Sequence, residues 1–119
     1  CPWYPPTNLS TFKYKDAEEC AASMESLLLG YNIMRNIKEA YNSSPVSKVT
    51  KDAPPFLIIH GINDQTVPFE QSEELYDKLI ENGCDADLIA LEGADHADMQ
   101  FFQDELWDRI IDFFKTKLG

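Results

Sequence analysis

Basic residues are scarce in this chain of 119 residues, where 10 Lys and Arg stand against 21 Asp and Glu for a formal net charge of -11. Nucleic-acid binding relies on clusters of Lys and Arg that neutralise phosphates, so this balance argues against a nucleic-acid partner. Anionic lipid surfaces are disfavoured for the same reason. No apolar stretch approaches the ~20 residues that span a bilayer, and we therefore expect no membrane partner.

Cysteine is also sparse. The three cysteines are odd in number and far apart in the sequence, at Cys1, Cys20 and Cys84. This pattern differs from a disulfide framework and from the short paired spacings of a zinc site. We expect reduced, ordinary thiols and neither a metal nor another cofactor.

The second half of the chain alternates between two hydrophobic periods. Residues 56–59 form a continuous apolar run that is typical of a strand buried on both faces of a parallel sheet. Apolar residues recur at helical spacings over 68–82, a second strand is predicted over 85–91, and an amphipathic helix over 101–118. Strand, helix, strand and helix in this order predict an α/β fold of parallel strands with flanking helices.

Two strands are too few for such a sheet. A parallel sheet needs cover on both faces and more strands than this segment provides. We expect the missing strands either in sequence that precedes Cys1 or in a partner chain. An isolated chain with an unpaired strand edge is expected to self-associate or to be unstable.

The first half is less regular. Residues 16–29 have the pattern of one amphipathic helix, with Met24, Leu27 and Leu28 on its apolar side, and residues 31–41 favour a second helix.

We divide the chain after residue 53. Residues 1–53 are predicted to hold the end of a core strand and a mostly helical excursion, and residues 54–119 the strand–helix–strand–helix core. A helical excursion between two strands of an α/β core lies where a cap over an active site belongs. The alternative is a surface pair of helices without contact to substrate.

Asp64 and His96 each stand just beyond the end of a predicted strand. The carboxyl ends of parallel strands meet at one edge of the sheet, where ligands bind, so these two side chains should converge. An imidazole can accept the proton of a serine hydroxyl, and a carboxylate can fix its tautomer and stabilise the imidazolium. We predict Asp64 and His96 as catalytic acid and base. Taken singly, Asp64 could instead cap a turn, and His96 could be an exposed loop side chain.

His60, at the end of the first strand, is a second histidine that could be taken for the base. Its position favours a partly buried ring that hydrogen-bonds loop backbone and supports the turn presenting Asp64. A facial metal triad of His60, Asp64 and His96 is conceivable, but nothing in their spacing requires it. Asp95 and Asp98 flank His96, and we expect Asp95 to point away from the imidazole Nδ1 because it adjoins the base.

The motif His-Gly-x-x-Asp-x-x-Val-Pro at 60–68, followed by Gly-Ala-Asp-His at 93–96, resembles the C-terminal part of α/β-hydrolase esterases. The similarity is to the branch of acetyl esterases, acetylxylan or feruloyl esterases and hormone-sensitive-lipase-like carboxylesterases. The segment 3–9 is similar to the Trp-Tyr-Gly-Pro-Thr-Asp segment that follows the strand after the nucleophile in these esterases. The resemblance implies that Asp64 is the triad acid and His96 the base, and the order acid before base agrees with that fold.

No Gly-x-Ser-x-Gly, the motif that carries the nucleophile in this fold, occurs in the chain. The resemblance implies that the serine and both oxyanion-hole N–H groups lie before Cys1. The whole protein is therefore expected to be a serine carboxylic-ester hydrolase with a small-molecule substrate, a short-chain or carbohydrate-linked ester. The chain alone should be inactive, because it lacks both the nucleophile and the oxyanion hole.

Three departures from the esterase pattern bear on substrate preference and loop geometry. Ile62 and Asn63 replace small or acidic residues before the acid, Asp95 stands where a glycine commonly precedes the histidine, and Pro5 replaces a glycine.

Two other functions stay open. Prolyl-oligopeptidase-type serine peptidases share nearly the same motifs, although the segment 3–9 favours an esterase. A non-catalytic α/β-hydrolase-like interaction domain, or a degenerate pseudo-esterase, is the second alternative. The sequence leaves the compartment, cytoplasmic or secreted, undetermined.

Overall fold

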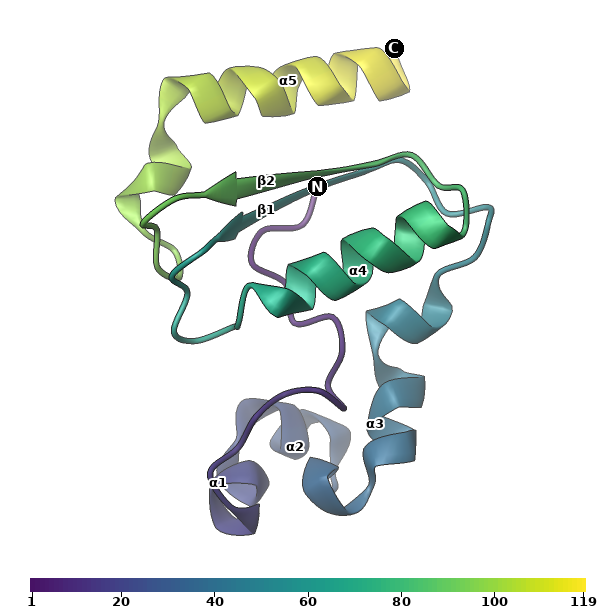
Figure 1. Cartoon of the computed structure of the whole chain (residues 1–119), viewed down its shortest axis with the longest axis vertical. Coiled ribbons are helices and arrows are strands. Elements are labelled where there is room, and N and C mark those ends of the chain that lie inside the picture. Colours follow the sequence, from purple (N-terminus) through teal and green to yellow (C-terminus); the bar gives the residue numbers. More distant parts are fainter.

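The computed structural model describes all residues from 1 to 119 (Figure 1). Its centre is a pair of parallel strands, β1 (Phe56–Gly61) and β2 (Ala86–Leu91), in register from Phe56 opposite Ala86 to Gly61 opposite Leu91. The start of the chain lies along the other edge of β1. There Trp3 forms a parallel bridge with Ile59, so three parallel segments lie side by side.

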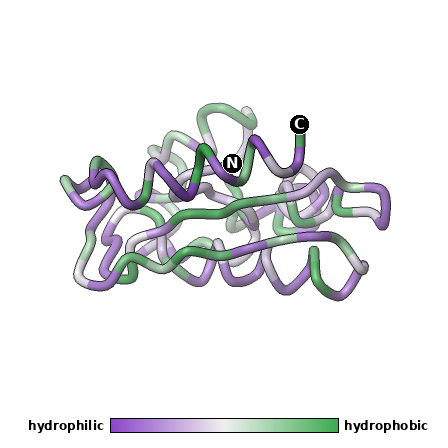
Figure 2. The backbone as a smooth tube through the Cα atoms, turned by 90° about the horizontal axis from the view of Figure 1, so that it is seen from above, coloured by the Kyte–Doolittle hydropathy of each residue, from purple (hydrophilic) through white to green (hydrophobic).

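Helices cover both faces of the sheet. In Figure 1, α5 (Asp104–Leu118) lies on one side of the strands and α4 (Glu70–Glu81) on the other. Side chains alternate across a strand, so Leu57 and Ile59 pack toward α5 while Ile58 packs toward α4. Figure 2 shows hydrophilic and hydrophobic residues alternating along α5 up to the C-terminus, as one buried side requires. The chain thus has a partial α/β fold.

The ends of the two long helices have local causes. Gly83, at φ 73°, adopts the left-handed conformation that ends α4. The last helix begins later than the predicted 101–118, because Gln103 is extended with ψ 140° and residues 99–102 form the separate 3-10 turn η3 (Met99–Phe102). Phe101 is completely buried beneath this turn, so it belongs to the loop after β2 and not to α5.

The helical excursion consists of short elements. They are α1 (Ala17–Ala22), α2 (Met24–Leu29), η1 (Ile33–Arg35), α3 (Ile37–Ser43) and η2 (Pro45–Lys48). A small cluster of buried residues holds them together: Leu9, Cys20, Ile33 and Ala40. None of the helices in the chain combines the length and the apolar character that a bilayer crossing requires.

The single helix predicted over 16–29 is wrong. Ser23 is extended, with ψ 150°, and its side chain accepts a hydrogen bond from the N–H of Ser26, which caps α2 and ends α1. Serine favours such caps because its hydroxyl competes for backbone groups. The break leaves Met24 and Leu28, predicted on the apolar side, 78% and 86% exposed.

A polar clamp holds the segment before the excursion against α4. The side-chain oxygen of Gln71 accepts the N–H groups of Thr7 and Asn8, at 2.9 and 2.8 Å. The side chain of Asn8 also donates to Glu74 at 2.6 Å. Because Gln71 is buried, these bonds satisfy backbone groups that water does not reach.

Candidate active site

The loops that follow β1 and β2 are joined by backbone hydrogen bonds. The N–H of Ile62 donates to the carbonyl of Leu91, and the N–H of Asn63 donates to the carbonyl of Ala94, both at 3.0 Å. A side chain at Gly61 would overlap the carbonyl of Ala94, so the close approach of the loops requires glycine at this position. The carboxyl ends of the two strands are therefore held in a fixed relation.

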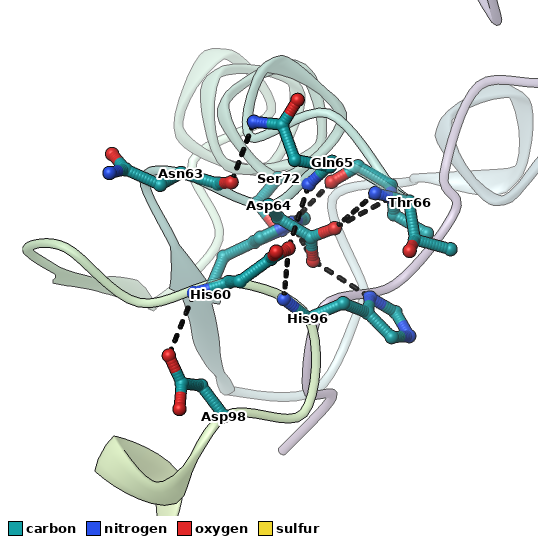
Figure 3. A network of polar contacts seen from close by, with 10 residues as sticks. His60, Asn63, Asp64, Gln65, Thr66, Ser72, His96 and Asp98 are labelled. Carbon is teal, nitrogen blue, oxygen red and sulfur yellow. Dashed lines mark hydrogen bonds and ion pairs between the residues drawn. The ribbon is translucent and has the colours of Figure 1, made fainter.

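The structure brings together the two predicted site residues, which are 32 positions apart in the sequence. Oδ2 of Asp64 lies 2.8 Å from Nδ1 of His96. The Asp64 side chain is fully buried, and that of His96 is 29% exposed. In Figure 3 the second ring nitrogen of His96 points away from Asp64, and it hydrogen-bonds no other group of the chain. Such an imidazole can accept a proton at Nε2 while the carboxylate holds its Nδ1–H.

Asp64 also makes a turn with its other carboxylate oxygen. Oδ1 accepts the N–H groups of Thr66 at 2.8 Å and Val67 at 2.7 Å (Figure 3). A buried carboxylate loses its hydration, and these bonds replace it. The turn role that the sequence offered as an alternative is thus present together with the contact to His96, on different oxygens.

An aromatic layer supports the ring of His96. The Tyr4 ring lies 4.2 Å from it between centroids, at 56°, and Phe101 packs edge-on against Tyr4 at 4.9 Å. Tyr4 has φ 36°, a left-handed conformation that costs a residue with a side chain some backbone strain. Its N–H donates to the carbonyl of Ile59 at 2.8 Å, which fixes it beside β1. The contact of Tyr4 with His96 was not predicted, although Tyr4 lies in the segment 3–9 that resembles the esterases.

Asp95 bridges the two loops. Its Oδ1 accepts the N–H of Gln65 at 2.9 Å and the N–H of His96 at 2.6 Å. Hydrogen bonds from the backbone of Gln65 and then of His96 lower the pKa of Asp95 below its usual range. The expectation that this side chain avoids the imidazole Nδ1 is confirmed, but its bridging contact was not predicted.

Asp98 does not contact the imidazole either. Its Oδ1 accepts the N–H of Met99 at 2.7 Å, which caps η3. Its Oδ2 lies 3.3 Å from the N–H of Asp95 (Figure 3). Asp64 is therefore the carboxylate that reaches the His96 ring.

His60 is fully buried, where the sequence predicted partial burial. Its Nε2 lies 2.8 Å from the carbonyl oxygen of Val67, so the predicted bond to loop backbone is confirmed. Its Nδ1 lies 2.6 Å from the hydroxyl of Ser72, on α4. Sequence reasoning missed Ser72; the signal was a serine on the face of α4 that also carries Leu75 and Leu79.

The contacts among His60, Asp64 and His96 do not form a metal site. No group of three or more His, Cys, Asp or Glu side chains in the chain is arranged as a metal site. The three cysteines are free thiols, with Cys20 and Cys84 buried.

Comparisons with known proteins identify esterases among the relatives of this chain. The family model described as BD-FAE matches residues 1–79. The Esterase LipC of Mycobacterium tuberculosis is 32% identical over 74 residues, which is 61% of this chain and 18% of LipC.

Two solved structures share the fold of nearly the whole chain. A truncated carbohydrate esterase from gut microbiota aligns with a TM-score of 0.81 at 28% identity, over 97% of this chain and 40% of that one. A bifunctional GH43-CE protein of Bacteroides eggerthii aligns with a TM-score of 0.84 at 26% identity, over 98% of this chain and 16% of that one. The chain therefore spans well under two thirds of the length of each of these relatives.

Proposed function

We propose that this chain, which belongs to the BD-FAE family of α/β-hydrolase esterases, carries the acid and base of a Ser-His-Asp ester hydrolase. The supporting observation is the 2.8 Å contact of buried Asp64 with Nδ1 of His96, whose Nε2 is unbonded. Asp64 fixes the tautomer of the ring. Nε2 of His96 takes the proton of a serine hydroxyl as that hydroxyl attacks the ester carbonyl, and then returns it to the leaving alcohol.

The nucleophile of this proposal lies outside the 119 residues. No serine of the chain hydrogen-bonds His96, and the buried Ser72 contacts His60 instead. A serine on a Gly-x-Ser-x-Gly turn and its oxyanion-hole donors would come from the sequence before Cys1. The chain by itself then has an acid and a base but no group to acylate, so it does not turn over esters.

We place residues 54–119 as the C-terminal strand–helix–strand–helix part of the hydrolase core. In this arrangement residues 1–53 contribute the end of the neighbouring strand and a cap-like helical excursion. The parallel bridge of Trp3 with Ile59 supports the strand assignment. The clamp between Asn8 and α4 supports the position of the excursion beside the core.

A carbohydrate-linked or other short-chain ester is the proposed substrate class. The alignment with a carbohydrate esterase over 97% of this chain supports it, as does the similarity to Esterase LipC. The side chain of His96 is 29% exposed, which is compatible with contact to a substrate.

Replacing His96 by alanine in the protein expressed from its full reading frame tests the proposal. Hydrolysis of p-nitrophenyl acetate should fall by about 10⁴-fold or more, since no other group can take the serine proton. Asp108→Asn, which alters an exposed carboxylate on α5, is the control and should retain full activity. Full hydrolysis by the His96→Ala protein would contradict the assignment of His96 as the base. No hydrolysis by the unaltered protein would favour a non-catalytic domain.

A further inference from the structure

A buried polar chain runs from α4 to the carboxylate that contacts His96. Ser72 and His60 are both fully buried, and so is the side chain of Asp64. The hydroxyl of Ser72 lies 2.6 Å from Nδ1 of His60, and Nε2 of His60 lies 3.2 Å from Oδ2 of Asp64. The same oxygen lies 2.8 Å from Nδ1 of His96, so both imidazoles contact one carboxylate oxygen of Asp64.

The partners of His60 determine which nitrogen carries its proton. The carbonyl oxygen of Val67, 2.8 Å from Nε2, can only accept, so Nε2 must be the donor. The neutral ring then has an unprotonated Nδ1, and the hydroxyl of Ser72 donates to it. This neutral Nε2–H tautomer accounts for both hydrogen bonds of the ring, while Oδ2 of Asp64 lies 3.2 Å from the same Nε2. Phe69, whose ring packs edge-on at 5.6 Å, closes one side of the imidazole.

We propose that His60 is a positioning residue of the triad: its Nε2–H holds the carbonyl of Val67 and so fixes the turn that presents Asp64 to Nδ1 of His96, and Ser72 fixes the His60 tautomer that makes this possible. The inference deepens the proposed function and rests on it for its catalytic meaning.

The hydrogen bonds of Asp64 explain why its position depends on this turn. Oδ1 is fixed by the N–H groups of Thr66 and Val67. Val67 is thus bound on both sides, its N–H by Asp64 and its carbonyl by His60, and without His60 the turn would lose the second of these bonds. His60 is a buried donor on β1, whereas His96 lies in a loop, so His60 can fix the position of Asp64 more firmly than His96 can. A small displacement of a catalytic group is costly.

The tautomer is tested by NMR of the protein expressed from its full reading frame with ¹⁵N-labelled histidine. Assignment uses His60→Gln and His96→Ala. His60 should give the pattern of a neutral ring protonated at Nε2, with an N–H that exchanges slowly with solvent. This result does not depend on ester hydrolysis, so it separates the proposed geometry from the proposed function. A ring protonated at Nδ1 alone would overturn the inference.

The positioning role is tested by kinetics on folded variants. His60→Leu should lower kcat for p-nitrophenyl acetate by about 10- to 100-fold with KM unchanged, because orientation is lost while binding is kept. His60→Gln, which offers an amide N–H, should recover part of that loss. Each variant is first checked for a cooperative thermal transition and for the His96 Nδ1–H resonance, which should exchange faster with solvent in His60→Leu.

If His60→Leu does not fold, Ser72→Ala provides the test of the positioning role. It removes only the hydroxyl, and it should lower kcat less than His60→Leu does while also speeding exchange of the His60 Nε2–H. Ser26→Ala is the matched control, since Ser26 is another buried serine but lies on α2. Unchanged kcat and unchanged His96 exchange in Ser72→Ala and in any folded His60→Leu would show that His60 has no part in positioning the triad.

Discussion

The loops at the strand ends bury polar side chains, whereas the helical excursion exposes apolar ones. The loops bury Asp64 and enclose His60 completely, and the polar atoms of both side chains are hydrogen-bonded. Met24 and Leu28 of the excursion are largely exposed to solvent. The helices of the excursion are short, and its own core is small.

This difference indicates where the geometry of the chain is fixed. Buried polar groups have defined positions because each unmade hydrogen bond is costly. An exposed apolar helix face carries no such restraint, and large patches of this kind promote association. Self-association of the isolated chain, expected from its strand edge, stays a prediction that sedimentation can test.

After His96→Ala, the largest effect should come from Asp64→Asn in the protein expressed from its full reading frame. The amide cannot accept from the backbone turn and from Nδ1–H as the carboxylate does, so the His96 tautomer is lost. We expect kcat for an ester to fall by about 10³- to 10⁴-fold. Steady-state kinetics measures this, and a loss confined to KM would contradict the assignment of Asp64.

Leucine truncation should separate the two regions by stability. Leu79 is completely buried between α4 and β1, and Leu79→Ala should lower the free energy of unfolding by about 2–5 kcal/mol. Leu28→Ala, on the exposed face of α2, should change it by about 0.5 kcal/mol or less. Urea unfolding of the protein expressed from its full reading frame compares them. Equal costs would show that the face of α2 is covered in solution.

Glycine-to-alanine substitutions in the two regions should differ in their effect on the contact between Asp64 and His96. Gly61→Ala pushes against the Ala94 carbonyl and should cost about 1–3 kcal/mol, with loss of the protected His96 Nδ1–H signal. Gly30→Ala, at φ 77° with open space around it, should cost about 1 kcal/mol and leave that signal intact. An intact signal in Gly61→Ala would mean that the loops do not need their close approach.

The smallest effect should come from Asp95→Asn. Because the folded pKa of Asp95 lies below its usual value, its ionised form stabilises the fold at neutral pH, and this contribution is lost as the pH falls through the lowered pKa. Asp95→Asn should therefore be slightly less stable than the unaltered chain at neutral pH and equal to it in strong acid. Urea midpoints at both pH values provide the comparison; a difference that grows in acid would refute it.

Sequence periodicity located the sheet and α4 within about two residues, within the uncertainty usual for element ends. Their pattern directly reflects burial on one or both faces. It failed over 31–41, where Asn36 separates the 3-10 turn η1 from α3, and it failed at Ser23 and at Phe101. Ser23 ends one helix and caps the next through a local hydroxyl contact, and Phe101 leaves the helical stripe because Trp3 and Tyr4 pack against it. The first depends on a competition between local bonds, and the second on a contact from the far end of the chain.

The same division holds for the site. The convergence of Asp64 and His96 could be predicted, because it follows from parallel strands and the loops at their ends. The Tyr4 ring beside His96 and the Ser72 hydroxyl beside His60 could not, since both depend on side-chain directions between segments distant in sequence.

One measurement tests the central claim most directly: labelling of the protein expressed from its full reading frame with a fluorophosphonate, followed by peptide mapping. The account predicts one labelled serine, within a Gly-x-Ser-x-Gly that precedes Cys1, and loss of labelling in His96→Ala with retention in Asp108→Asn. Labelling that persists without His96, or no labelled serine at all, would contradict the assignment of Asp64 and His96 as the acid and base of a serine esterase.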